Sequence, residues 1–307
     1  MISRKLFLKN TAALAMGGLM LPNSFAGNLF IAGSPALGIQ LFTFFNSIDG
    51  DVNGTLQKIA AAGYTEIESA FSRKGGFYGM SAKEFSAALK KLGLSWKSHH
   101  VIGAPFKIPA NAKPPVDANG KPISIPPMRN LRDNYQDIVN ELAEAGLPYV
   151  VCASTPVGTG DEIKQSTEVL HKAGEAAKKA GMQLAYHNHE AEFKTVEEII
   201  PYDHFLSQIP ADVLKMELDL AWAVKAGVDP IALFKKHPGR FPLWHVKDID
   251  QEGKVQPVGK GTIDFKPIFN AASTAGMKHF FVEHDMPADA WASINSSKEY
   301  LTTLLKS

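Results

Sequence analysis

The stretch Ala180-Gly181-Met182-Gln183-Leu184-Ala185-Tyr186-His187-Asn188-His189 contains the end of a helix, a short apolar strand and a polar strand end. A Gly directly after a helical run supplies the left-handed conformation that ends a helix without a side-chain clash. A helix end followed by Gly and an apolar residue occurs four more times, at Ala62-Gly63-Tyr64, Leu92-Gly93-Leu94, Ala145-Gly146-Leu147 and Ala275-Gly276-Met277. This pattern predicts repeated units in which a strand directly follows a helix.

Apolar runs of strand length alternate with amphipathic runs of helix length from Gly38 onward, which is typical of a parallel sheet covered by helices. The expected strands are 38–44, 64–69, 94–100, 147–153, 182–188, 213–219, 242–247 and 278–284. The expected helices are 52–62, 81–92, 130–145, 160–180, 196–208, 229–237, 264–275 and 290–305. Eight strands and eight helices predict an α/β fold with a single (β/α)8 TIM barrel, which leaves no exposed sheet edge.

The size and composition of the chain agree with one large domain and a small-molecule partner. The 307 residues are 45% hydrophobic, and such a barrel needs about 250 residues. The 32 basic and 31 acidic residues nearly cancel, so no strong field attracts nucleic acid or an anionic membrane surface. Cys152 is the single cysteine, which rules out an internal disulfide, and its apolar strand setting offers nothing that would make it a nucleophile.

The first 26 residues have the organisation of an export signal. The basic string Ser3-Arg4-Lys5-Leu6-Phe7-Leu8-Lys9 precedes an apolar run at 11–21, which is too short to span a bilayer, and the small residues of Ser24-Phe25-Ala26 follow. We therefore expect residues 1–26 to direct export to the periplasm and residues 27–307 to form the folded domain. The basic string resembles a twin-arginine signal with Lys5 in place of the second arginine, so either export route fits. The alternative is an ordinary N-terminal helix.

A proline-rich segment at 101–129 separates the third expected strand from the next helix. It contains seven prolines, which fix φ and remove hydrogen-bond donors, so it is expected to be an irregular excursion. It leaves the barrel from the C-terminal end of a strand. We expect it to form a wall or lid over a site there, with Phe106 and Lys107 as substrate contacts; the alternative is a solvated surface insertion.

Imidazole and carboxylate side chains stand at the ends of the last four expected strands. Side chains at i and i+2 of a strand share a face, and active sites of (β/α)8 barrels lie at the C-terminal mouth. Buried charges without a partner are costly, and a divalent cation offsets that cost. The expected metal ligands, one from each strand, are His187, Asp219, His245 and Glu283. His189 or Glu217 can replace one of them. This donor mixture suits Mn²⁺, Zn²⁺, Co²⁺ or Fe²⁺ better than Ca²⁺ and leaves the identity open.

Further polar groups point to the same mouth. They are Gln40, Glu68 and His100 on the first three strands, and Lys247 beside His245. Lys247 next to a metal is expected to lose proton affinity and to act as an acid, a base or an oxyanion partner. Trp222 is placed in a loop at the mouth, where its ring can face a sugar. The structural alternatives are a salt-linked barrel floor for Gln40 and Glu68, and an ion pair with Asp248 for Lys247.

These motifs, taken together and in order, resemble the sugar phosphate isomerase/epimerase family of xylose isomerase-like barrels over residues 38–305. The motifs are Gly38-Ile39-Gln40-Leu41-Phe42-Thr43, Gly63-Tyr64-Thr65-Glu66-Ile67-Glu68, Ser98-His99-His100, Tyr186-His187-Asn188-His189-Glu190, Glu217-Leu218-Asp219, Gly239-Arg240, His245-Val246-Lys247-Asp248, Val258-Gly259-Lys260-Gly261-Thr262-Ile263-Asp264-Phe265 and Phe281-Val282-Glu283-His284-Asp285.

The resemblance implies a divalent metal that holds vicinal oxygens of a carbohydrate substrate while a side chain removes a proton α to a carbonyl. The metal then acts as a Lewis acid that stabilises the enediolate. Asp219, His245 and Glu283 match the family's ligands on the last three strands. Ketose 3-epimerases of this family carry a Glu where this chain has His187, so a proton relay between two carboxylates is not expected here.

The Tyr-His-Asn-His motif resembles the branch of inosose dehydratases, C-glycoside deglycosylating enzymes and exported 3-keto-glycoside lyases. This likeness implies a neutral keto-sugar or keto-glycoside substrate and β-elimination after proton removal. The expected base is His189, with His100 or Lys247 assisting the leaving oxygen and Glu68 among the catalytic groups. The expected substrate contacts are Gln40, Trp222, Glu217 and Phe106.

Three other functions compete with this prediction. A sugar isomerase or epimerase would use the same metal but return the proton to carbon. A periplasmic sugar-binding barrel without turnover would not need ligand-type residues at all four strand ends. An endonuclease for apurinic sites needs a basic groove, which a net charge of +1 does not favour. The sequence does not indicate the oligomeric state.

Overall fold

The computed structural model describes residues 36–105 and 128–306. The predicted export segment, Phe106, Lys107 and most of the proline-rich segment lie outside these ranges. Within them, every helix is too short or too polar to cross a bilayer.

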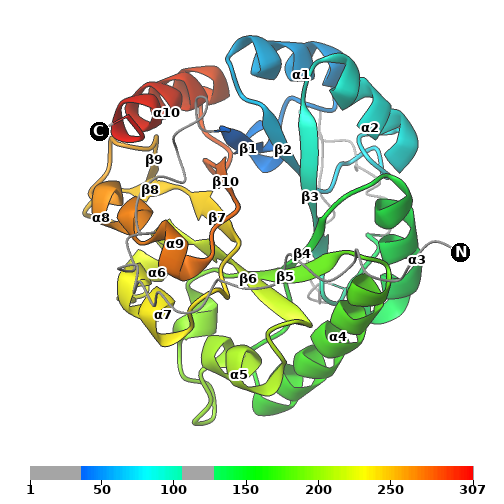
Figure 1. Ribbon diagram of the computed structural model, residues 1–307, viewed down its shortest axis with the longest axis vertical. Coiled ribbons are helices and arrows are strands. Elements are labelled where there is room, and N and C mark those ends of the chain that lie inside the picture. The colour runs from blue at the N-terminus through cyan, green and yellow to red at the C-terminus, as the bar shows by residue number, and fades with distance from the viewer. Residues whose placement is uncertain (1–35, 106–127, 307) are drawn as a thin grey trace, which may run out of the picture.

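In the described part of the chain, eight parallel strands close a barrel in the order β1-β10-β7-β6-β5-β4-β3-β2, and the helices surround it as an outer ring (Figure 1). The barrel strands are β1 (Gly38–Gln40), β2 (Glu66–Ser69), β3 (Ser95–Ile102), β4 (Tyr149–Ser154), β5 (Gln183–His187), β6 (Leu214–Asp219), β7 (Leu243–Val246) and β10 (His279–Val282). The helices are α1 (Val52–Ala61), α2 (Ala82–Lys91), α3 (Leu131–Glu144), α4 (Gly160–Lys179), α5 (Pro201–Gln208), α6 (Leu220–Lys225), α7 (Pro230–Lys236), α8 (Phe265–Asn270), α9 (Ala272–Ala275) and α10 (Ala290–Leu304). The predicted single (β/α)8 fold is confirmed.

Seven of the eight predicted strands match the observed ones to within two residues at each end. The five glycines expected to end helices all have positive φ, between 72° and 90°. The predicted reason for these glycines is therefore confirmed, because residues with a Cβ rarely adopt this conformation.

Some predicted boundaries are wrong for local reasons. The strand predicted at 38–44 ends at Gln40, because the Gln40 side chain accepts a hydrogen bond from the Phe42 backbone and starts the 3₁₀ helix η1 (Leu41–Phe44). The helix predicted from 196 begins at Pro201, which occupies its first position. The helix predicted at 264–275 is divided into α8 and α9.

Two elements near the mouth were not predicted. Helix α6 begins directly after β6, so Trp222 lies on a helix and not in a loop. Strands β8 (Asp248–Ile249) and β9 (Val255–Gln256) form a small antiparallel hairpin after β7.

The proline-rich excursion begins later than predicted, because Val101 and Ile102 belong to β3. Ile102 pairs with Asn130, which brings the two ends of the excursion together.

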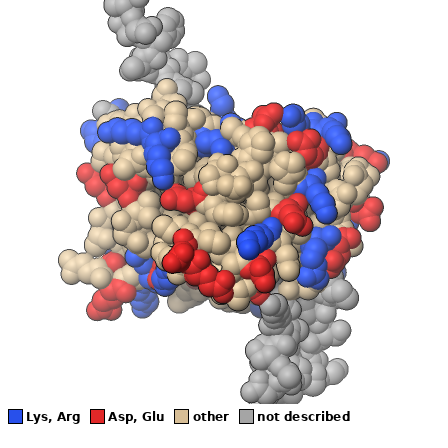
Figure 2. Space-filling view, turned by 90° about the horizontal axis from the view of Figure 1, so that it is seen from below, with Lys and Arg blue, Asp and Glu red and all other residues tan. Residues whose placement is uncertain are grey.

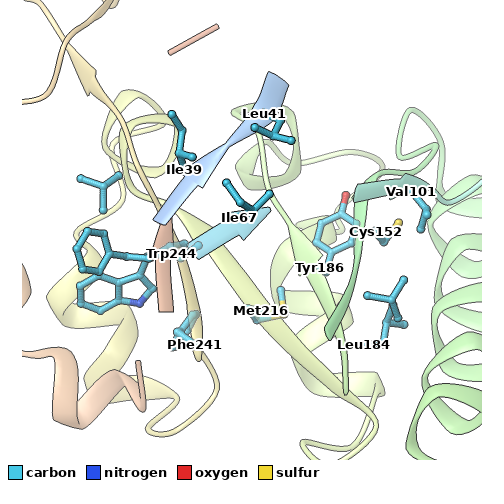
Figure 3. Close-up of a cluster of buried hydrophobic side chains, with 14 of the residues drawn as sticks. Ile39, Leu41, Ile67, Val101, Cys152, Leu184, Tyr186, Met216, Phe241 and Trp244 are labelled. Carbon is cyan, nitrogen blue, oxygen red and sulfur yellow. The ribbon is translucent and has the colours of Figure 1, made fainter. Parts of the chain in front are cut away.

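The buried apolar side chains form two clusters. Most buried apolar side chains, such as Ile39, Leu184 and Trp244, pack between the barrel and the helices (Figure 3). A second, smaller cluster comprises Val151, Ala185, Leu243 and Phe281 on four barrel strands. The polar strand ends follow this cluster toward the C-terminal mouth. The smaller apolar cluster therefore lies beneath the polar side chains of the mouth.

The charged side chains on the outer surface are mixed in sign. Lys and Arg side chains alternate with Asp and Glu over the face drawn in Figure 2, and no large area of this face carries one sign of charge. This distribution agrees with the formal net charge of +1. It gives no support for a nucleic-acid partner on this face.

Gly38 permits the close approach of β1 and β10, and Gly38→Ala is expected to destabilise the barrel. An added Cβ would lie 2.3 Å from the Phe280 carbonyl oxygen and 2.6 Å from the Phe281 ring, and the backbone contact cannot give way. We expect a loss of about 1–3 kcal/mol in the free energy of unfolding, measured by urea titration. The matched control is Gly158→Ala, which meets only the flexible end of Glu162. Equal stability of the two variants would contradict this account.

Candidate metal centre

Four buried side chains from four strands bring donor atoms together at the barrel mouth. His100, His187, Glu217 and His245 each offer one atom, and these atoms all lie within 4.8 Å of one another. We call them the inner set. Glu217 Oε2 lies 2.7 Å from His100 Nε2 and 3.2 Å from both His187 Nδ1 and His245 Nε2. Three imidazole nitrogens therefore surround one carboxylate oxygen.

A second group of donors uses the other nitrogen of the same histidine. Asp219, His245 and Glu283 form the outer set, also within 4.8 Å of one another. His245 Nδ1 lies 2.8 Å from Glu283 Oε2 and 3.9 Å from Asp219 Oδ2. His245 thus belongs to both sets, with Nε2 facing the inner set and Nδ1 facing the outer set.

The four predicted ligands therefore do not form a single set. Asp219, His245 and Glu283 lie together, as expected, but His187 belongs to the inner set. The register of the sheet explains this, because His187 pairs with Glu217 whereas Asp219 pairs with His245. His187 consequently lies about two residues deeper in the barrel than Asp219. Glu217, predicted as a substrate contact or a replacement ligand, occupies the centre of the inner set.

Glu68 adds a second carboxylate to the inner set. Its Oε1 accepts a hydrogen bond from Gln40 Nε2 at 2.7 Å, lies 3.1 Å from His100 Nε2, and is hydrogen-bonded to His245 Nε2. These buried contacts of Glu68 are also those that the alternative of a salt-linked barrel floor predicts. Glu66, at the start of β2, forms a separate polar floor, because it pairs with Lys97 at 3.4 Å and His279 at 2.8 Å.

Burial and neighbouring charges shift the pKa values of the side chains in this cluster in different directions. Burial opposes ionisation of Glu68, but the charges of His100 and His245 outweigh it and hold the pKa of this carboxyl well below its ordinary value. Burial and the charge of Glu68 raise the pKa of Glu217 well above its ordinary value. Burial and the charge of His245 lower the pKa of His187. Burial disfavours a charged His245, but the surrounding carboxylates dominate and raise its pKa.

Several donor atoms of the cluster lack hydrogen bonds. Glu68 Oε2, His187 Nδ1 and Glu217 Oε1 are fully enclosed and make none. Leaving such a group unsatisfied costs about 1–3 kcal/mol, so the arrangement favours a bound ligand that accepts electron pairs. Mixed nitrogen and oxygen donors suit a divalent metal of the first transition row. The cluster therefore fits a divalent metal, whose identity its donors do not determine.

Lys247 neutralises the carboxylates of the outer set. Its ammonium lies 2.7 Å from Glu283, 2.9 Å from Asp285 and 3.1 Å from Asp219. Burial opposes the charged form, but in the absence of a metal these carboxylates raise the pKa of Lys247 well above its ordinary value. The loss of proton affinity predicted for Lys247 beside a bound metal stays a prediction. The described ion pairs of Lys247 are with these three carboxylates and not with Asp248, which was the alternative.

Asp248 instead holds a loop. Its carboxylate accepts hydrogen bonds from four backbone N–H groups, at Ile249, Gly259, Gly261 and Ile263. Backbone donors of this kind satisfy a buried carboxylate without a counter-ion. Lys247 and Asp248 therefore have separate partners although they are adjacent in the chain.

His189 and Trp222 lie above the inner set. The exposed His189 ring is 4.9 Å from the buried His187 ring and 6.2 Å from Trp222, measured between centroids. Lys247 Nζ lies 5.3 Å from the centre of the Trp222 ring. Asp219 fixes this tryptophan, because its Oδ1 accepts the Trp222 backbone N–H at 2.9 Å and caps α6. The mouth thus combines a solvent-accessible imidazole with an indole ring.

The comparison with known families agrees with this geometry. The profile of the family described as "Xylose isomerase-like TIM barrel" matches residues 56–304. The chain belongs to this family. Among its xylose isomerase-like relatives, the inosose dehydratase of Lacticaseibacillus casei is 29% identical over 140 residues, covering 39% of this chain and 46% of that enzyme. The inosose dehydratase of Clostridium perfringens is 33% identical over 129 residues, covering 36% of this chain and 42% of that enzyme. The chain therefore spans less than half the length of these relatives.

Solved structures show the same xylose isomerase-like barrel. The sugar phosphate isomerase/epimerase of Parabacteroides distasonis has a TM-score of 0.70 and 25% identity, covering 91% of this chain and 97% of that one. The IOLI protein with a bound zinc atom has a TM-score of 0.64 and 16% identity, covering 88% and 98%. The latter likeness shows the shared fold alone.

Sequence reasoning missed the residues that support this xylose isomerase-like centre. The Asn188 side chain donates to the Asp219 carbonyl oxygen at 3.3 Å and accepts the Asp219 backbone N–H at 3.1 Å. Glu192 accepts hydrogen bonds from the Tyr186 hydroxyl and the His189 backbone. Asn188 was missed because only residues expected to face the barrel interior were considered, whereas Asn188 connects neighbouring strands. Its polar side chain within the Tyr-His-Asn-His motif was the sequence signal that could have identified it.

Asn188→Ala is expected to weaken metal binding although it removes no metal-donor atom. Both backbone groups of Asp219 would lose their partner, so Asp219 and the start of α6 would be held less firmly. Supporting residues of this kind typically change metal affinity or activity by about 10–100-fold, and we expect a loss in that range. Chelator competition measures the affinity. The control Asn140→Ala lies on the exposed side of α3 and should leave it unchanged. Unaltered affinity in Asn188→Ala would refute this role.

Proposed function

We propose that this protein is a divalent-metal-dependent enzyme that removes a proton α to the carbonyl of a keto-sugar or keto-glycoside and then eliminates water or a glycosidic oxygen from the β position. The observation that carries the proposal is the buried convergence of three imidazoles with the carboxylates of Glu68 and Glu217, in which three enclosed donor atoms have no hydrogen bond. The names of the inosose dehydratase relatives support elimination, because a dehydratase releases water.

The roles of the side chains follow from their positions. A bound divalent metal would act as a Lewis acid toward the substrate carbonyl, and the donors of the cluster would hold it. His189 is accessible from the mouth and serves as the base. His100 or Lys247 assists the leaving oxygen, and the Lys247 ammonium is held beside Glu283 at 2.7 Å. Trp222 covers one side of the sugar.

A panel of oxidised and unoxidised glycosides tests the proposed reaction. Protein reconstituted with Mn²⁺, Zn²⁺, Co²⁺ or Fe²⁺ is expected to release the aglycone from a 3-keto-glycoside, or water from a keto-polyol, and to leave unoxidised glycosides intact. Deuterium incorporation into a recovered, ring-intact sugar without elimination would indicate an isomerase or epimerase instead. Sugar binding without turnover by any metal form would indicate a binding protein and refute the proposal.

His189→Gln is expected to lower turnover by about 10²–10⁴-fold, the usual contribution of a general base. Metal content should stay unchanged, because His189 belongs to neither donor set. Initial rates and elemental analysis on the same samples give both readouts. The control is His171→Gln, which replaces an exposed imidazole on the outer helix α4 and should keep the rate of the parent protein. Loss of metal together with activity would reassign His189 as a ligand.

We further propose that residues 1–26 direct export to the periplasm. The support is the basic, apolar and small-residue order of that segment. Fractionation of cells that express the full chain should recover a shortened protein in the periplasm. Recovery of the uncut chain in the cytoplasm would refute the proposal.

A further inference from the structure

We propose that a small cavity beside β3 binds an aromatic ring that carries a hydrogen-bond acceptor. Only the identification of this ring as the aglycone, the group that leaves a keto-glycoside with its glycosidic oxygen, rests on the proposed function. The cavity lies where the loop after β2, the end of β3 and the chain entering α3 meet, on the side of the barrel where Figure 1 shows these elements. We call it the side cavity. His100 is part of its wall, so an occupant would lie next to the inner set.

The side cavity has the size of one ring. Its volume is about 90 Å³, and Phe71, Val101 and Ile138 are among the apolar side chains that line it. A buried water needs about 10–15 Å³ of such space, so the cavity has room for about six waters or for one six-membered ring with a substituent. It therefore accommodates one part of a glycoside and not the whole molecule.

An aromatic group forms one wall of the side cavity. Phe71, which lines it, belongs to a group of three half-buried phenylalanines that follow β1 and β2. The Phe71 ring lies 5.7 Å from that of Phe42 and 5.8 Å from that of Phe45, measured between centroids. Aromatic rings favour tilted or offset neighbours at about 4.5–7 Å, so a further ring in the cavity would extend this packing.

The loop that carries Phe71 is held in place before any ligand binds. The Asp49 carboxylate accepts hydrogen bonds from the Ser72 hydroxyl at 2.6 Å and from the Arg73 backbone N–H at 3.0 Å. Gly76 follows with a φ of 53°, and a Cβ there would lie 2.7 Å from the Met80 carbonyl oxygen. A wall that is already ordered lowers the entropic cost of binding. The glycine also leaves this wall without a side chain, as a flat ring requires.

His99 supplies a hydrogen-bond donor to the side cavity that it lines. The Trp96 indole N–H can only donate, and it donates to Ser69 Oγ at 2.8 Å. Ser69 Oγ also lies 2.8 Å from His99 Nδ1, whereas the Ser98 carbonyl oxygen is 3.5 Å away, which is long for a hydroxyl donor. The Ser69 hydrogen therefore goes to Nδ1. A neutral His99 then carries its own proton on Nε2, where it can bond an acceptor on the ring.

Binding of phenol to the zinc-loaded full chain tests the side cavity without turnover. Ligand-observed NMR titration should detect binding to the parent protein and a loss of at least about 10-fold in affinity for Phe71→Ala, because a packed aromatic wall dominates such sites. His99→Phe keeps a ring of similar size but removes the donor, and should weaken binding by about 3–10-fold. The control is Phe193→Ala, which removes a half-buried phenylalanine that packs on Tyr202 and does not line the cavity. Absence of binding to the parent, or equal losses in Phe71→Ala and Phe193→Ala, would overturn the inference.

The leaving group gives a second test. Phenyl and methyl 3-keto-glucosides differ in intrinsic reactivity, but this difference is the same for the parent protein and for a variant. The ratio of kcat/KM for the phenyl to the methyl compound should therefore fall by at least about 10-fold in Phe71→Ala and stay unchanged in Phe193→Ala. An unchanged ratio in Phe71→Ala would overturn the assignment of the ring as the aglycone. Phenol binding as expected without turnover of any keto-glycoside would refute the proposed function and leave the side cavity as a site for an aromatic ring.

Discussion

His245→Gln is expected to strip the metal from the protein and to reduce turnover by more than about 100-fold. In the described part of the chain, His245 is the one residue that both donor sets share, so neither set is complete without it. The substitution also leaves Glu68 and Glu283 short of a buried partner, which should cost about 3 kcal/mol in the free energy of unfolding. Elemental analysis after dialysis and urea titration in the presence of chelator measure the two effects.

His279→Gln is the control for this prediction. His279 also bonds a glutamate, at 2.8 Å, and also lies on a barrel strand, but it belongs to the polar floor and to neither donor set. Its metal content should equal that of the parent protein. One equivalent of metal retained by dialysed His245→Gln would place the metal elsewhere in the molecule and would contradict both donor sets.

The repeated helix–Gly–strand pattern was sufficient to predict the barrel because each of its signals is local. A Gly such as Gly181 ends a helix through its own φ, and the apolar strand that follows is read from neighbouring residues. The wrong element boundaries also have local causes, but these causes are side-chain contacts. Strand β1 ends early because Gln40 accepts a hydrogen bond from Phe42, and composition does not reveal that bond.

The sequence predicts which strand residues face the barrel interior but not how deep in the barrel each one lies. Alternation along a strand shows that His187 and Asp219 face the same interior, but only the register between β5 and β6 shows that His187 is level with Glu217. The partners of Lys247 could not be inferred either. They come from β6 and from the chain beyond β10, and in sequence Asp248 is the nearer carboxylate.

Lys247→Met is expected to destabilise the folded protein by about 3–5 kcal/mol, the largest stability change that we predict. Methionine keeps most of the buried length of the side chain but removes the charge, so Asp219, Glu283 and Asp285 would face one another without a cation. Breaking a buried ion pair by removing one partner is costly because the remaining charges stay desolvated. Urea titration at pH 7 measures the loss.

Lys225→Met is the matched control, because Lys225 also lies over the Trp222 ring, 4.7 Å from its centre, but is exposed and pairs with Glu190 at 3.5 Å. It should change stability by no more than about 0.5 kcal/mol. The pH dependence gives a second check. Without the ammonium, the pKa values of the buried carboxyls rise in the folded state, so the folded Lys247→Met protein binds more protons than the unfolded chain. Its stability should therefore fall as the pH rises from 5 to 8. A pH-independent loss, or equal losses in the two variants, would contradict a role for Lys247 as the counter-ion of the outer set.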